Sequence, residues 1–316
     1  MNNAPVITSA PVRSRNIALV AALMIILGAA SARAQDRRTD AQQMPGTKTI
    51  MLRLDDLGMC HAVNVAAKRV IETGMPFSAS LMVACPWYQE AVEMLRQAPH
   101  VSVGVHLTLN AEWKNYRWGP VAGAGAVPSL VDSNGHFFPS RALFFANNPK
   151  TEEVERELRS QIGRALASGL KIDYVDYHMG TAVDTPELRA LVERLAREHA
   201  LAISRYFGEV DVNGLYAAPV ERKTDTLIAL ARGLQPDTLR LMVFHVGLAT
   251  PEMSALVDLN PTGLSRMADH RQGELEALTS EEFLEFLQLP DVRVLTYRDL
   301  IRQNGLDSMV RPEPGY

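Results

Sequence analysis

Two adjacent carboxylates, Asp55 and Asp56, close an apolar stretch near the start of the chain. Neighbouring side chains on an extended strand point in different directions, so one carboxylate can ligate a cation while the other accepts a proton from water. Metal-assisted hydrolysis needs this division of work. An aspartate pair at the end of a strand can also cap a helix in a solvated turn, so the pair alone is a candidate that needs partners.

Two later stretches each carry a single histidine near their C-terminal end. His106 lies in the apolar residues 103–109, and His178 follows residues 173–177. A lone histidine at such a place is more often a core or turn residue than a ligand. In a parallel barrel, however, the C-terminal ends of the strands meet at one mouth, so Asp56, His106 and His178 could ligate one ion. Two imidazoles and one carboxylate leave coordination positions open, as in a catalytic site, and suit zinc, iron, cobalt or manganese better than calcium.

Further polar residues are expected near the same mouth. Asp176 precedes His178 by two positions, so its carboxylate could orient an imidazole, unless it is solvated or paired in the core. His245, at the end of another apolar stretch, is expected to act as a general acid or to steady an oxyanion, with a structural role as the alternative. Arg271 and Glu274 lie three residues apart and are expected to form an ion pair on a helix surface.

A long irregular segment, residues 110–149, is rich in aromatic residues. Segments of this length inside a domain are usually functional lids or disordered insertions. We expect Trp113, Trp118 and Phe137 to bind substrate, because flat rings stack on sugar faces. The alternative is a small satellite core under the loop.

Short β-rich stretches alternate with longer amphipathic ones from residue 49 onward, a pattern typical of a parallel sheet built from βα units. No Gly-x-Gly-x-x-Gly follows the first stretch, and polar residues gather where strands end. These features favour an α/β fold of the distorted or incomplete (β/α) TIM-like barrel type over an open doubly wound sheet. The seven expected parallel strands are residues 49–55, 78–83, 101–107, 174–178, 202–207, 241–246 and 292–297.

The first 34 residues have the parts of a secretory signal peptide. Arginines precede an apolar stretch that is too short for an ordinary membrane span, and small residues precede an expected cut after Ala34. We therefore expect a periplasmic or secreted protein, with an uncleaved N-terminal anchor as the alternative. The expected order is signal peptide (1–34), polar linker (35–47), barrel domain (48–305) and C-terminal tail (306–316).

The charge of the chain limits its partners. Of 32 basic and 36 acidic residues, three arginines and no acid lie in the signal peptide, so the mature chain has 29 and 36, a net charge of about −7. It contains no long lysine or arginine run, which argues against nucleic acid or, after signal cleavage, a membrane as partner. A neutral or basic substrate fits better, and a homo-oligomer is compatible with the sequence. Cys60 and Cys85 either pair with each other or stay free and buried.

Together these motifs resemble the YdjC-like, or ChbG-type, carbohydrate deacetylase family. The family's Asp-Asp-Phe-Gly and following Val-Asn correspond to residues 55–58 and 63–64, and its Gly-x-His-Leu corresponds to residues 104–107. The remaining matches are Asp-x-His at 176–178, His-Pro-Gly at 245–247, and Pro-Ser-Leu-Val-Asp before Gly and Phe at 128–132, Gly135 and Phe137. The likeness covers about residues 49–287.

The resemblance implies a distorted barrel with a divalent metal ion on Asp56, His106 and His178. Magnesium or zinc is expected first, with cobalt or manganese as alternatives. It also implies that Asp55 is the base and that an N-acetyl group is hydrolysed from a small carbohydrate or oligosaccharide, releasing acetate.

The chain departs from the family pattern at Gly180, where a second histidine is usual, and at Val246, where proline is usual. Neither departure removes a proposed ligand. Two other functions are a non-catalytic periplasmic glycan-binding protein and another metal-dependent hydrolase, such as an amidase or a phosphoesterase. The intact set of candidate catalytic residues argues against a pure binder, and the absence of an arginine cluster near the motifs argues against a phosphate substrate.

Overall fold

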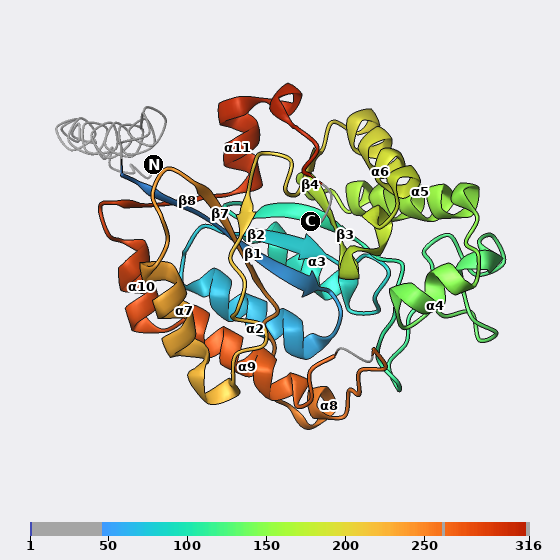
Figure 1. Cartoon of the computed structure of the whole chain (residues 1–316), viewed down its shortest axis with the longest axis horizontal. Coiled ribbons are helices and arrows are strands. Elements are labelled where there is room, and N and C mark those ends of the chain that lie inside the picture. Colours follow the sequence, from blue (N-terminus) through green and yellow to red (C-terminus); the bar gives the residue numbers. More distant parts are fainter. Residues whose placement is uncertain (2–45, 261–262, 314–316) are drawn as a thin grey trace. The chain divides into compact units, whose positions relative to one another are not determined.

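An eight-stranded parallel sheet organises the described part of the chain (Figure 1). The computed structural model describes residue 1, residues 46–260 and residues 263–313; the expected signal peptide beyond Met1, and the expected linker up to residue 45, lie outside the described residues. The strands are β1 (Lys48–Leu57), β2 (Ser78–Leu81), β3 (Ser102–Leu107), β4 (Ile172–Tyr177), β5 (Ala202–Ile203), β6 (Val210–Asp211), β7 (Leu239–Phe244) and β8 (Val292–Leu295).

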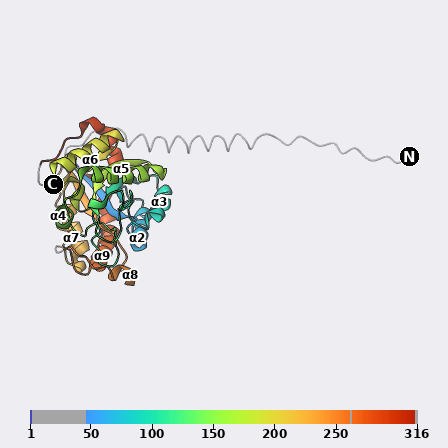
Figure 2. The same cartoon turned by 90° about the vertical axis from the view of Figure 1, so that its right-hand side faces the viewer.

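Helices cover the outside of this sheet (Figures 1 and 2). Among the described residues, no helix is both long and apolar enough to cross a membrane. The α-helices are α2 (His61–Glu72), α3 (Tyr88–Arg96), α4 (Arg141–Ala146), α5 (Thr151–Ala167), α6 (Pro186–Glu198), α7 (Lys223–Arg232), α8 (Pro251–Ser254), α9 (Met267–Leu278), α10 (Glu281–Leu287) and α11 (Tyr297–Asn304), with 3₁₀ helices η1 (Pro128–Leu130), η2 (His178–Val183), η3 (Val220–Arg222) and η4 (Leu306–Ser308).

The sheet forms an incomplete barrel, which confirms the predicted fold class. Its order is β5-β4-β3-β2-β1-β7-β6, so β5 and β6 lie at the two ends. All seven expected strands are present, and the eighth, β6, was missed because it is only two half-buried residues long. β8 pairs with the first half of β1, Lys48–Met51, while β2 pairs with β1 from Arg53 onward. β7 pairs with Thr49–Leu54, so it lies on the opposite edge of β1 from both.

One end of the barrel interior is filled with apolar side chains. Met51, Tyr174, Leu241 and Tyr297 form a buried cluster there, and the two tyrosine rings lie 4.1 Å apart. Gly104 makes room for this packing, because a Cβ atom at that position would collide with the Tyr174 ring. Side chains alternate between the two faces of a strand, so the residues that follow at even spacing face the same interior nearer the mouth. In β1, and in β4 with the residue that follows it, polar residues occupy those positions, namely Arg53, Asp55, Asp176 and His178.

The alternate side chains of the strands pack outward into a larger core. Ile50, Leu52 and Leu54 of β1 belong to it with Val63 and Val70 of α2, and all five are fully buried. Cys60 and Cys85 lie in the same core and are not bonded to each other. Of the two expectations for this pair, the structure therefore shows free, buried cysteines rather than a disulfide.

Residues of the expected C-terminal tail lie against the barrel domain. The backbone N–H of Val310 donates to the carbonyl of Tyr206 over 2.8 Å. The guanidinium of Arg311 contacts Glu193 of α6, with Nε 2.6 Å from Oε1. The domain boundaries remain predictions.

Candidate metal centre and active site

Asp56, His106 and His178 direct their ligand atoms toward one another at the barrel mouth. Asp56 Oδ1 lies 3.5 Å from His106 Nε2 and 3.4 Å from His178 Nδ1. The two imidazole nitrogens are 3.3 Å apart. The three residues are buried, and one ligand atom from each fits within a 4.8 Å separation. Three such ligands with further positions open are the arrangement of a catalytic metal site.

A bulge at the end of β1 brings both aspartates to this mouth. The pairing of β1 with β2 shifts between Leu54 and Leu57. Asp56 lies within the bulge and has a left-handed backbone with φ 66°, a conformation that aspartate adopts more readily than most residues. The regular alternation expected from the sequence is therefore broken, and Asp55 and Asp56 both border the same cavity.

The donor set fits a cation. Asp56 Oδ1 is buried and has no hydrogen-bond partner within the described residues. A buried carboxylate oxygen without a donor costs roughly 1–3 kcal/mol or more in protein environments. The other oxygen, Oδ2, accepts a 2.6 Å hydrogen bond from Arg271 Nη2, which fixes the carboxylate so that Oδ1 faces the imidazoles. A metal ion would satisfy Oδ1 in this position.

A second carboxylate orients each imidazole. Asp176 Oδ2 lies 3.0 Å from His106 Nδ1, the partner that the sequence suggested for one of the histidines. Glu112 Oε2 lies 3.0 Å from His178 Nε2. Each carboxylate favours a proton on the ring nitrogen that it contacts, so the other nitrogen is left for the ion. Glu112 was missed because it lies in the irregular segment, where no strand end marks it.

The charges around the ligands also favour a cation. Burial by itself would lower the pKa of His106, but the charges of Asp176 and Asp55 outweigh burial and raise that pKa to about 10. For His178, burial is likewise outweighed, by Glu112 and Asp56, and the pKa rises to about 9. Both imidazoles thus attract positive charge, and an entering ion displaces their protons. The surrounding charged groups are four carboxylates and two guanidiniums, from Asp55, Asp56, Glu112 and Asp176 and from Arg53 and Arg271.

Asp55 is held in its ionised form by Arg53. The guanidinium grips the carboxylate with two hydrogen bonds, Nε to Oδ1 at 2.7 Å and Nη2 to Oδ2 at 2.8 Å. Burial would raise the pKa of Asp55, but the Arg53 charge outweighs burial and lowers the pKa to about 2. Ser204 accepts a third hydrogen bond from Arg53, at 2.7 Å, and steadies the pair. Asp55 is therefore ionised at neutral pH, which is the form that can accept a proton.

Arg271 and Glu274 are not the surface pair that their spacing predicted. They are 4% and 2% exposed on α9 and make separate contacts. Arg271 binds Asp56, whereas Glu274 Oε1 accepts a 3.0 Å bond from the buried Lys223 and Oε2 accepts a 2.7 Å bond from the backbone of His245. The prediction failed because α9 packs against other elements rather than facing solvent. The pair Lys223–Glu274 instead anchors the backbone that carries His245.

His245 lies just after β7 and borders the same space as Asp55. Its Nδ1 atom is buried and has no hydrogen-bond partner in the described chain. The ring of Tyr216 meets it edge-on at 5.5 Å. This position is compatible with the predicted role of His245 as a general acid, which stays a prediction.

The long segment packs down rather than opening as a sugar-binding platform. Phe137 is fully buried, and Trp118 is 3% exposed, with its Nε1–H donating to the carbonyl of Asn110 over 2.8 Å. Neither ring has an exposed face in this structure, which favours the satellite-core alternative, and the stacking role stays a prediction. Trp113 is also buried, but it borders the smaller cavity and lies 5.9 Å from the Arg271 guanidinium.

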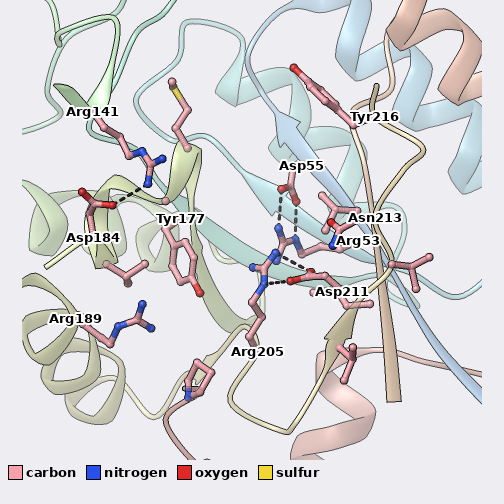
Figure 3. A pocket seen from close by; sticks show the side chains of 18 of the residues that line it. Arg53, Asp55, Arg141, Tyr177, Asp184, Arg189, Arg205, Asp211, Asn213 and Tyr216 are labelled. Carbon is pink, nitrogen blue, oxygen red and sulfur yellow. Dashed lines mark hydrogen bonds and ion pairs between the residues drawn. The ribbon is translucent and has the colours of Figure 1, made fainter. Parts of the chain in front are cut away.

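Two cavities meet at Asp55 and His245. The smaller, of about 240 Å³, is lined by Asp56, His106 and His178. The larger, of about 1060 Å³, opens beside it (Figure 3). Both are bordered by Asp55, Tyr177, Met179, Tyr216 and His245. Tyr216 is 42% exposed, which makes it the aromatic residue of this shared border with the largest accessible face.

Known proteins resemble this chain over most of its length. A family model described as YdjC-like protein matches residues 49–289. A carbohydrate deacetylase from Brevibacillus brevis is 32% identical over 268 residues, which cover 79% of this chain and 99% of that protein. Carbohydrate deacetylase 1 from Listeria innocua is 26% identical over 258 residues, with 79% and 99% covered.

A solved structure shows the same fold. A protein from Enterococcus faecalis V583, provisionally named a cellobiose-phosphate cleavage protein, matches with a TM-score of 0.63 and 23% identity. The match covers 80% of this chain and 99% of that one. Since the family model also spans most of the sequence, the chain belongs to the YdjC-like protein family.

Proposed function

We propose that this protein is a metal-dependent carbohydrate deacetylase, a hydrolase that removes N-acetyl groups from amino sugars or oligosaccharides and releases acetate. The observation that carries the proposal is Asp56 Oδ1, a buried acceptor without a hydrogen bond in the described chain, facing two imidazole nitrogens beside the ionised Asp55. The relatives named carbohydrate deacetylases support the same reaction class.

The ion would be held by Asp56, His106 and His178. We propose zinc or magnesium, with cobalt or manganese as alternatives. Imidazole ligands favour zinc within this group, because magnesium prefers oxygen ligands. When bound here, a divalent ion would act as a Lewis acid that polarises the acetamide carbonyl.

The chain's own residues supply the proton transfers. Asp55 takes a proton from the water that attacks the acetyl carbon, because Arg53 keeps its carboxylate ionised. His245 gives a proton to the sugar nitrogen as the carbon–nitrogen bond breaks, which leaves acetate and a free amine. Arg271 keeps Asp56 in place through the hydrogen bond to Oδ2.

Acetate release tests the proposal directly. The mature protein is treated with a chelator and given N-acetylglucosamine oligosaccharides, with and without added zinc, magnesium, cobalt or manganese. We expect no acetate after chelation and recovery with at least one ion. Bound metal without acetate from any N-acetylated sugar would contradict deacetylation and favour a glycan-binding protein.

We also propose that the protein is exported to the periplasm or secreted. The support is the sequence of residues 1–34, with its arginines, apolar stretch and small residues before Gln35. N-terminal sequencing of the protein from its native host is expected to begin at Gln35. An intact N-terminus in the membrane fraction would instead indicate the uncleaved anchor.

A further inference from the structure

Tyr216, in the segment between β6 and η3, brings an accessible aromatic ring to the reaction centre (Figure 3). It borders both cavities together with Asp55 and His245, and it is 42% exposed. The other tyrosine and tryptophan on these borders, Tyr177 and Trp113, are 8% and 1% exposed. Among the described residues, Tyr216 is therefore the aromatic side chain at this place that a ligand can reach most easily.

The Tyr216 ring lies next to the residue that is expected to protonate the leaving amine. Its centroid is 5.5 Å from that of His245, and the two ring planes are inclined by 66°. The rings are thus in contact without being stacked face to face. A sugar ring that packs against Tyr216 therefore lies beside His245 and Asp55, where the acetamide must be placed for hydrolysis.

A buried lysine fixes the backbone of Tyr216. Lys223 begins α7 and is 1% exposed. Its Nζ donates hydrogen bonds to the carbonyls of Leu215 and Tyr216, both over 2.8 Å, and to Glu274 Oε1 over 3.0 Å. An ammonium group has three N–H donors, so each of them has a partner. The position of the Tyr216 backbone is thus set from inside the protein.

The same ion pair also holds the backbone of His245. Glu274, which is 2% exposed, uses its second oxygen, Oε2, to accept a 2.7 Å hydrogen bond from the His245 N–H. Replacing a buried ion pair by apolar side chains of similar size is often neutral or stabilising, so such a pair is weak evidence for a role in stability. Here the pair of Lys223 and Glu274 ties two separate segments of the site border to one fixed point.

We propose that Tyr216 binds a sugar ring of the substrate by stacking, and that Lys223 and Glu274 are positioning residues that hold Tyr216 beside His245. This inference rests on the deacetylase function proposed above and names the residue that the sugar contacts. A tyrosine ring offers a large apolar face, and ligand sites combine such faces with a few polar groups that fix orientation. The sequence had suggested aromatic residues of segment 110–149 for this role.

Two variants of Tyr216 test the binding role in the metal-loaded protein, with a neutral N-acetylglucosamine trisaccharide as substrate. We expect Tyr216→Ala to raise KM by about tenfold or more and to leave kcat near its normal value, because the ring contributes binding rather than proton transfer. Tyr216→Phe keeps the ring and is expected to keep KM. Trp87→Ala is the matched control, because Trp87 is 38% exposed but borders neither cavity.

Two outcomes would overturn the binding role. One is an unchanged KM in Tyr216→Ala. The other is a lower kcat with unchanged KM in Tyr216→Phe, which would assign the hydroxyl to the chemistry instead of the ring to the sugar.

Lys223→Met combined with Glu274→Gln tests the positioning role. The double change removes both charges, so no unpaired charge stays buried. The glutamine oxygen can still accept the bond from His245, whereas methionine cannot hold the Tyr216 carbonyl. We expect KM to rise, and the addition of Tyr216→Ala to raise it little further, because both changes act through the same ring. Fully additive effects would refute the positioning role.

Glu274→Asp is the second variant, for use if thermal unfolding shows that the double variant does not fold. It keeps both charges, but its shorter side chain cannot hold Lys223 and the His245 N–H in their present places. The same non-additive effect with Tyr216→Ala is expected. Additivity here would likewise refute the role of the pair.

A binding measurement separates this inference from the proposed function. If no acetate forms while metal is bound, the deacetylase function fails. Calorimetric Kd values of the same trisaccharide for the unaltered protein and for Tyr216→Ala then decide the inference alone. Weaker binding by the variant would support the stacking role, and equal Kd values would reject it.

Discussion

Asp55→Asn lowers kcat for acetate release by about 10²- to 10⁴-fold, the usual contribution of a general base. The amide cannot take a proton from water, yet it keeps the shape of the carboxylate, and its one oxygen can still accept a hydrogen bond from Arg53. The metal ligands are untouched, so the bound ion is expected to remain at the level of the unaltered protein. The measurements are steady-state acetate release and metal content on the same preparation.

Asp173→Asn is the matched control for this variant. Asp173 is another buried aspartate that binds an arginine, with Oδ2 2.9 Å from Arg298 Nε. It lies near the start of β4, whereas Asp55 lies near the end of β1, so the two occupy opposite ends of the barrel. Its loss can lower stability but is not expected to slow the reaction. Near-normal kcat in Asp55→Asn would remove Asp55 from the role of base.

His106→Ala is expected to weaken metal binding by more than about 100-fold, because losing a ligand exceeds the 10- to 100-fold effect of losing a partner that only orients one. Asp176→Asn is expected to fall within that smaller range, since the amide orients His106 less firmly. Metal content after dialysis against graded chelator concentrations gives the affinities. The pH must be fixed, because the raised pKa values of His106 and His178 make protons compete with the ion.

His100→Ala serves as the control, because His100 is exposed in the turn before β3. It should bind metal as the unaltered protein does. Normal metal affinity in His106→Ala would exclude His106 as a ligand and direct attention to other donors.

The alternation of strands and helices was predictable because it depends on local patterns. β1 and β7, for example, are apolar stretches of six or more residues and were found within three residues of their true ends. β6 was not found, since its two residues are only half-buried and do not belong to an apolar stretch, unlike the equally short but buried β5. The placement of Asp56, His106 and His178 near one another followed from the rule that parallel strands end on the same side.

The partners of these residues could not be predicted in the same way. Arg53 lies inside β1, where a charged residue looks like an exception to an apolar stretch. Glu112 lies in an irregular segment, and Arg271 follows the ligands by many residues on a helix. Contacts of this kind depend on tertiary packing, which spacing along the sequence does not encode.

The two ends of the sheet have a consequence for the tendency of the protein to aggregate. A long exposed strand presents unpaired backbone groups onto which a second chain can add, which is a common route to aggregation. β5 and β6 are two residues each, and the charged Arg205 and Asp211 lie at or beside them. Such short, charged edges give an incoming strand almost nothing to pair with. The barrel can thus remain open for a substrate without becoming a template for fibrils.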